Sequence, residues 1–559
     1  MPKNSNHAVA SLALLALSAC AAPIVRIEQP DFREGAPAID RLVDLGGWPL
    51  PASGQLSQED SDGVLTPGEW VAVLGHGLDA GSKSSLTIDG TAVAVRGHLQ
   101  GGSLLVQVPR KLAPRRAHQL AVTTPSGTAS IEFHVRSYVV VGDTDGKTVR
   151  FLPMEFDGKA MISKSAVDLE LNGAHLHTLS PSGAWLYILQ ETGLLGQSGP
   201  VTADIAVVHM GARKRPRMIG SFSVRSVSPP TALTMVDENT LLVLGENDLL
   251  VCEVTAGRIV PSASVPLPRS PGKSLYVDVL PLPGRSAAVV LEAYSNAVTL
   301  IDLSDLHQPR VVNTLSAGET NDIPWSVNLT PDLDDPTGFW LLQGPNLRIS
   351  GEKLGRFADR LAAKTKAALG MKTSAPAPTA APGNKPTDAD QNKGARLVHL
   401  RAVAGFLEIE RDDERALPDD FLPFYVLSQP KGEFLVSGVS SDIFRFAGIP
   451  RSFDGVKTVV DVLANSLQFG RVLRLRKAGP DEWTLKGPTL YFNLDTLADG
   501  TMVYSTIQPG VSVLPPSLEV QWGVDATGPS ATGRDFRDLN ALEWTALLPP
   551  YTFGLLSVQ

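Results

Sequence analysis

The sequence predicts an all-β protein: an N-terminal sandwich followed by a larger propeller. Three observations predict this class. The 559 residues, enough for two or three domains, include 50 glycines and 43 prolines, a turn-rich composition that disfavours long helices. From about residue 36, short apolar strands alternate with Gly and Pro turns. Beyond Tyr138, pairs of hydrophobic strands that flank a polar turn recur along the chain, as in radially repeated sheets.

Composition and charge exclude several classes of protein. Hydrophobic residues make up 43% of the chain and charged residues 19%, so the chain can build cores and is not a disordered polymer. The net charge of −9 argues against nucleic acid as a partner, because phosphate binding needs a basic face. The two cysteines exclude a disulfide scaffold and a zinc-ribbon array.

The first residues predict export to the bacterial envelope. Lys3 precedes an apolar run, Ala8 to Ala19, which is roughly half the ~20 residues that a membrane-spanning helix needs. Residues 1–19 are therefore expected to be a cleaved signal peptide. Residues 20–35, rich in charge and proline, are expected to form a tether.

The end of this run resembles the bacterial lipobox: Leu17-Ser18-Ala19-Cys20 has an aliphatic residue, two small ones and a cysteine. The resemblance implies that Cys20 is acylated and holds the mature chain to a membrane. The next residue is Ala21 and not the Asp that often retains lipoproteins in the inner membrane. This implies an outer-membrane lipoprotein on the periplasmic or cell-surface face. The alternative is an ordinary signal peptide with a chance cysteine.

Residues 36–136 predict a β-sandwich. Apolar strands occupy Trp70–Asp79, Leu86–Val95, Leu104–Pro109 and His118–Val135. The turns include Gly75-x-Gly77, Ile88-Asp89-Gly90, Val108-Pro109 and Thr124-Pro125-x-Gly127, and with these the segment resembles the IPT/TIG immunoglobulin-like family over nearly its full length. The family implies a module that spaces or binds, without catalytic residues.

Residues 138–559 predict the propeller. Leucines before the turns, at Leu179, Leu233, Leu280 and Leu329, lie about 50 residues apart, near the length of a four-stranded blade. The segment Asn296–Leu315 resembles LVIVP and YVTN-type bacterial propeller repeats. Six or seven blades are expected. The final strands, LEWTALLPPYTFGLLSV, are expected to close the ring against the first strand, YVVVGD.

The propeller contains an insertion at residues 352–394. Leu354, Phe357, Leu361 and Ala368 recur at helical spacing, and the following Pro/Ala-rich stretch has the composition of a disordered loop. The helix either caps the propeller or docks on a partner or a membrane.

The segment Gln58–Glu69 has the spacing of a calcium loop. Gln58, Asp60 and Asp62 fall at positions one, three and five, Gly63 at the turn and Glu69 at the bidentate position twelve. Clustered carboxylates suit calcium, which takes six to eight hard oxygens. Asp60, Asp62 and Glu69 are the candidate calcium ligands, and a solvated turn is the alternative. No other cofactor is expected.

Weaker signals have structural alternatives. His175 and His177 share one face of a strand and suit a metal or a structural pair. The basic run 212–217 suits a polyanion, such as lipopolysaccharide phosphates, or a solvated loop. Cys252 is expected to be a buried core thiol. Two acidic groups are expected in turns: Asp332, Asp334 and Asp335, and Asp412 to Glu414.

These observations favour a non-enzymatic, outer-membrane-anchored lipoprotein that binds an envelope protein or a surface glycan. No Gly-x-Ser-x-Gly, HExxH, phosphate-loop or Cys-x-x-Cys motif is present. One alternative is a propeller-type polysaccharide lyase, hydrolase or lactonase, which requires ionisable side chains that converge on the central channel. Another is a calcium-strengthened adhesin.

Overall fold

The computed structural model describes most of residues 36–344, 394–440 and 470–507, with 517–521, 533–535 and 556–558; residues 1–35, 47–62, 345–393, 441–469 and several shorter segments are not described. Cys20, Asp60, Asp62 and the insertion 352–394 therefore lie almost entirely outside the described part. The described elements are all β-strands. Within these residues, no helix has the length and apolar character needed to cross a membrane.

Two antiparallel sheets form the N-terminal sandwich. The first has the order β1 (Ala38–Gly46), β3 (Trp70–His76), β7 (Leu104–Gln107) and β6 (Val95–His98). The second contains β9 (Gly127–Gly142), β8 (His118–Thr124), β4 (Ser85–Ile88) and β5 (Thr91–Val93), and β2 (Val64–Leu65) pairs in parallel with β9. Apolar side chains of both sheets share one core, including Val71, Val73, Leu120, Val122 and Phe133. The finer assignment to the IPT/TIG family stays a prediction.

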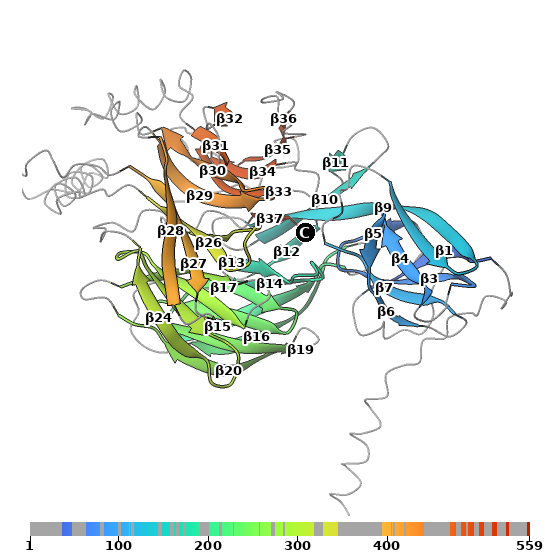
Figure 1. Cartoon of the computed structure of the whole chain (residues 1–559), viewed down its shortest axis with the longest axis horizontal. Helices are drawn as coiled ribbons and strands as arrows, with labels where there is room; N and C mark the ends of the chain where they lie inside the picture. Colours follow the sequence, from blue (N-terminus) through green and yellow to red (C-terminus); the bar gives the residue numbers. More distant parts are fainter. Residues whose placement is uncertain are drawn as a thin grey trace, which may run out of the picture.

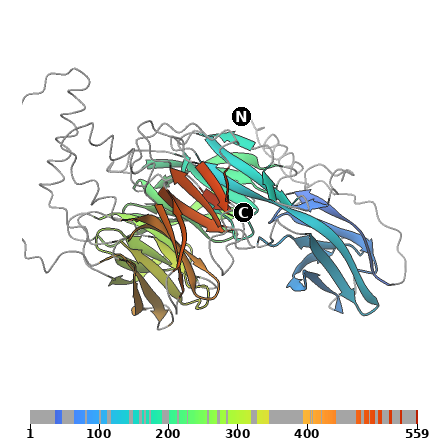
Figure 2. The ribbon, with the colours of Figure 1, turned by 90° about the horizontal axis from the view of Figure 1, so that it is seen from above.

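One strand belongs to both parts of the molecule. The first half of β9 pairs with β8 in the sandwich, and residues 136–142 pair with β10 (Thr148–Phe156) in the propeller. In Figures 1 and 2, β9 runs from the sandwich to the propeller as one long ribbon. The expected boundary near residue 137 thus falls inside a continuous strand.

Among the described residues, six four-stranded antiparallel sheets follow in chain order. They are β13 (Ala174–Leu179), β14 (Trp185–Gln190), β15 (Val201–His209) and β16 (Arg217–Ser226); β17 (Pro230–Asp237), β18 (Thr240–Gly245), β19 (Asp248–Thr255) and β20 (Arg258–Pro266); and β21 (Tyr276–Pro281), β22 (Ala287–Glu292), β23 (Ala297–Asp302) and β24 (Arg310–Ser316). The others are β25 (Leu329–Pro331), β26 (Gly338–Gln343), β27 (Arg396–Val403) and β28 (Glu408–Ala416); β29 (Phe421–Gln429), β30 (Glu433–Ser440), β31 (Gly470–Arg476) and β32 (Glu482–Gly487); and β33 (Leu490–Thr496), β34 (Met502–Ile507), β35 (Ser517–Gln521) and β36 (Gly533–Asp535).

The last strand closes the ring. β37 (Leu556–Val558) pairs antiparallel with Val139–Val141 of β9, and β10 then pairs with β11 (Met161–Ser163) and β12 (Val167–Glu170). These antiparallel strands complete a seventh blade beside the six regular ones. The expected closure of the ring by the end of the chain is confirmed. The architecture is that of a β-propeller.

Apolar layers between neighbouring blades hold the ring. The strands β18, β22 and β26 are buried at every position, because a middle strand is covered by blades on both faces. Cys252 is fully buried in one such layer, as expected, and burial raises the pKa of its thiol to about 12. The prediction that Asp412 to Glu414 lie in a turn is wrong, because these residues belong to the outer strand β28. That strand is exposed along most of its length, so charged side chains stay solvated there.

Candidate functional site

The inner strands of the propeller are tied to one another by polar contacts around the central axis. The Leu329 amide of β25 donates to Asp278 Oδ2 of β21 (2.7 Å). Between the next two blades, Asn328 accepts from the Val426 amide (3.1 Å) and donates to the Val426 carbonyl (3.0 Å). Thr330 of β25 donates to Ser428 Oγ of β29 (2.9 Å). These contacts fasten three successive blades at their inner edges.

Asp278 is a carboxyl group of these contacts whose pKa is raised. It is half-buried, and Oδ1 accepts from the Val279 amide (2.8 Å). Burial raises the pKa of Asp278 to about 6, although the amide donors of Leu329 and Val279 lower it. Asp278 therefore changes its charge close to neutral pH.

Two carboxylates, Asp278 and Asp495, lie within electrostatic reach of the phenol of Tyr425. Tyr425 of β29 is half-buried, and burial raises the pKa of its hydroxyl, with further increases from the charges of Asp495 and Asp278. Asp495 lies near the end of β33, where Gln429 donates to the neighbouring Thr496 hydroxyl (3.3 Å). Strands of three blades thus bring Asp278, Tyr425 and Asp495 into one hub.

Arg110 of the sandwich reaches the rim of this hub. Burial lowers the pKa of its guanidinium, and the carboxylates Asp495 and Glu238 oppose that effect. Glu238 lies in the turn between β17 and β18 and accepts from the Ser182 amide (2.5 Å) and hydroxyl (3.1 Å). The charges of two blades thus act on Arg110, which belongs to the sandwich.

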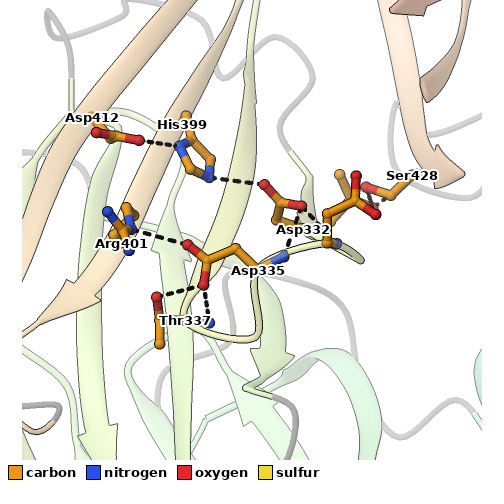
Figure 3. A network of polar contacts seen from close by, with 9 residues as sticks. Asp332, Asp335, Thr337, His399, Arg401, Asp412 and Ser428 are labelled. Atoms are coloured by element: carbon orange, nitrogen blue, oxygen red, sulfur yellow. Dashed lines mark hydrogen bonds and ion pairs between the residues drawn. The ribbon is translucent and has the colours of Figure 1, made fainter. Parts of the chain in front are cut away.

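A second polar network lies inside the blade formed by β25 to β28 (Figure 3). His399 is 2% exposed and is held between two carboxylates, with Nδ1 2.9 Å from Asp412 Oδ2 and Nε2 3.2 Å from Asp332 Oδ2. The second contact is an ion-pair distance without hydrogen-bond alignment. The imidazole also lies 4.5 Å from the ring of Trp340.

The turn beside His399 is closed by its own carboxylates, in the turn where Asp332, Asp334 and Asp335 were expected. Asp332 Oδ1 accepts from the amides of Asp334 (2.9 Å) and Asp335 (3.2 Å). Burial acts against ionisation of Asp335, but the hydroxyl and amide of Thr337, with Arg401 and His399, lower its pKa overall. These side chains are engaged with one another (Figure 3), so we interpret the network as a structural one.

A third arrangement has residue types familiar from hydrolases. Ser262 Oγ lies 2.8 Å from His307 Nδ1, and His307 Nε2 lies 3.6 Å from Glu253 Oε1. The set lies on the outer rim, with His307 72% exposed, and Ser262 also donates to the Leu306 carbonyl (3.3 Å). Water competes for every group there, so the set ties the loop before β24 to β20 and does not form an enclosed site.

Only some of the predicted site residues lie in the described part of the chain. Glu69 is buried, and its Oε2 accepts from the Thr66 amide (2.8 Å), while Asp60 and Asp62 lie outside the described residues. His177 is half-buried on β13, and the side chain of His175 is not described. In the described part of the chain, no group of three or more His, Cys, Asp or Glu side chains could hold a metal ion. The calcium site stays a prediction.

The basic run 212–217 is described only from Arg215 onward. Arg215 and Arg217 are exposed. The hub residues were not predicted, although Asp278 gives a signal: a carboxylate in the middle of the apolar strand Tyr276–Pro281 needs a special partner.

Comparisons with known proteins return only distant structural neighbours. No family model and no curated protein matches the sequence. Among solved structures, a protein from Bacteroides uniformis provisionally described as a 6-phosphogluconolactonase is 9% identical, with 76% of this chain and 99% of that chain covered and a TM-score of 0.46. The periplasmic gluconolactonase of Pseudomonas aeruginosa is 11% identical (70% and 93% covered, TM-score 0.43). The β-propeller domain of Cps50 (Swd1) from Myceliophteria thermophila is 9% identical (70% and 98% covered, TM-score 0.40). Each of these TM-scores is below 0.5, so the likenesses carry no argument about this chain.

Proposed function

We propose that the chain is an outer-membrane-anchored lipoprotein whose propeller is a binding or scaffold module for an envelope protein or a surface glycan. The observation that carries the proposal is that the polar groups around the axis are engaged by the backbone and by one another. Both oxygens of Asp278 accept backbone amides, and Arg110 is attracted to Glu238 and Asp495. These groups hold blades and sandwich together, which makes a stiff platform.

The sandwich covers one end of the propeller and so favours the opposite end for a partner. In each antiparallel blade, the turns between the first and second strands and between the third and fourth lie at one end. The sandwich lies against this end, at the turns that contain Ala184, Gly211 and Glu238. Second strands are joined to third strands at the opposite end, as β26 is to β27 and β30 to β31. Loops on a rigid scaffold are where binding residues concentrate.

The membrane anchor is tested by replacing Cys20. We expect C20S to lose incorporation of labelled palmitate and to move from the outer-membrane fraction to the soluble fraction, because several acyl chains at ~0.8 kcal/mol per buried CH₂ supply the attachment. C252A is the matched control, since it removes the other thiol and keeps the lipobox. An unchanged membrane fraction of C20S would show that the anchor is wrong.

A lactonase or hydrolase is the second candidate, and Asp278 is the observation that favours it. A carboxyl group with a pKa of about 6 beside a tyrosine has the charge change that a general base needs.

For the scaffold, we expect crosslinking on cells to recover one envelope protein or glycan in stoichiometric amount, and purified protein to leave a panel of lactones and polysaccharides intact. Turnover that rises as the pH passes about 6 and is lost in D278N, but not in the exposed control E253Q, would favour the enzyme.

A further inference from the structure

The outer strands of two neighbouring blades begin in the same way. β16 begins with Arg217 and β20 begins with Arg258, and both arginines are exposed. An aliphatic residue follows each arginine by two positions: Ile219 is 49% exposed and Val260 is 48% exposed. They are two of the three exposed large hydrophobic side chains among the described residues. We call Arg217, Ile219, Arg258 and Val260 the arginine patch.

The arginine patch lies on the side of the propeller that carries the sandwich. In the ladder of its blade, Arg217 is opposite His209, the last residue of β15. Arg258 is opposite Thr255, the last residue of β19. Both arginines therefore lie beside the turn between a third and a fourth strand, at the end against which the sandwich lies. β16 and β20 also contact each other, so the two halves of the patch are neighbours on the surface.

The residues opposite the two arginines carry no negative charge. Burial and the charge of Arg217 lower the pKa of His209 to about 4, so His209 is neutral at pH 7. Thr255, opposite Arg258, is uncharged. The patch therefore presents two guanidinium groups to solvent on a chain whose net charge is −9.

The next blade shows where the positive surface ends. β24 also begins with an arginine, Arg310, but its Nη2 lies 2.9 Å from Oδ2 of Asp302 on the neighbouring strand. This ion pair compensates the charge of Arg310. Within the patch, Glu253 is opposite Val260, and its Oε1 lies 3.6 Å from His307 Nε2. Two positive charges and one negative charge leave the patch positive.

The backbone of β16 favours contact through side chains. The register between β15 and β16 shifts between Val207 and Val208, which pair with Gly220 and Met218, so Ile219 is the extra residue of a β-bulge. A bulge bends an edge strand and interrupts its ladder, which disfavours the addition of a strand from another protein. The arginine and aliphatic side chains are therefore the groups that a partner meets.

Arginine beside an aliphatic side chain suits the surface of an anionic lipid bilayer. A guanidinium binds phosphate through paired hydrogen bonds, and an aliphatic side chain enters the boundary between headgroups and acyl chains. The proposed anchor at Cys20 keeps such a surface within reach, and this step rests on the proposed function. Only the sixteen residues 20–35 connect the anchor to the described chain, and they span at most about 55 Å.

We propose that the arginine patch is a contact surface for anionic phospholipid headgroups. Arg217 and Arg258 bind the lipid phosphates, while Ile219 and Val260 lie at the boundary with the acyl chains. The propeller then lies with its sandwich side toward the membrane. Its opposite end, which we favour for the envelope partner, faces away from the lipid.

Hydrogen exchange of the full-length protein with added vesicles tests this contact. We expect peptides that cover residues 217–222 and 258–264 to gain protection with vesicles of phosphatidylethanolamine and phosphatidylglycerol, and not with phosphatidylcholine vesicles. The protection should weaken as the salt concentration rises, because salt screens exposed charges. Since the lipid is added, the patch is tested even if C20S shows that the anchor is wrong.

Matched variants separate the patch from other exposed residues. R217Q and R258Q should each raise the lipid concentration at half-maximal protection about fivefold, the change expected for one arginine at an anionic surface. R225Q removes an exposed arginine of the same strand, eight residues or about 26 Å away, and should change it by less than about twofold. I219S should also weaken the contact, whereas L333S removes an exposed leucine two blades further on and should not.

Three results would overturn the proposal. The first is equal protection by anionic and phosphatidylcholine vesicles, and the second is an equal effect of R217Q and R225Q. The third is protection of these peptides by a lipid-free extract of envelope proteins but not by vesicles, which would assign the patch to a protein partner. Loss of the anchor with the protection by vesicles intact would contradict the proposed function alone.

Discussion

Replacing His399 with alanine is expected to lower the free energy of unfolding by about 2–5 kcal/mol, as truncation of a large buried side chain to alanine generally does. The substitution leaves Asp332, whose side chain is 4% exposed, without the His399 ring beside it. It also removes the ring that packs on Trp340 and the partner of Asp412. Chemical denaturation followed by tryptophan fluorescence measures the change.

H307A is the matched control for this prediction. His307 also lies beside a carboxylate, but it is 72% exposed, so its replacement should change the stability by no more than about 0.5 kcal/mol. If H399A were as stable as H307A, the network of Figure 3 would not contribute to the stability of the propeller.

Much of the propeller could be predicted because each blade repeats the same local pattern. The leucines before the turns mark inner strands that the structure places in successive sheets, as with Leu179 in β13 and Leu233 in β17. The closing strand was also predictable, since the ring leaves an unpaired edge at the first strand. The continuity of β9 was not. Inside and outside residues alternate along a strand in the same way whether it pairs with a sandwich or with a propeller sheet.

The hub could not be predicted because its residues meet only when the ring closes. Asp278, Tyr425 and Asp495 lie on inner strands of three different sheets, and Arg110 comes from another part of the fold. The sequence shows which strand carries a charge, but not which blades face one another across the axis. The prediction of a turn at the acidic residues of β28 was wrong for a different reason. Asp413 and its neighbours are residue types that form turns, but they are equally well solvated on an exposed outer strand.

Ending the chain before Leu556 is expected to open the propeller. β37 contributes three residue pairs with β9, and each backbone hydrogen bond contributes about 1 kcal/mol, so we expect a loss of about 2–4 kcal/mol. The truncation also exposes the β9 edge at Val139–Val141, and an open edge invites pairing with another chain. The truncated protein should melt at a lower temperature and form dimers or larger species, as measured by calorimetry and by light scattering after size exclusion.

Removal of Gln559 alone separates the pairing of β37 from a general effect of shortening the chain, because Gln559 lies beyond the paired residues. This control should melt like the full chain and remain in the same oligomeric state. A peptide that contains Leu556–Val558 should restore the melting temperature of the truncated protein if the loss comes from the unpaired edge. If truncation before Leu556 changed neither the melting temperature nor the oligomeric state, the ring would be held by its apolar inter-blade layers alone, and closure by the last strand would not be a source of stability.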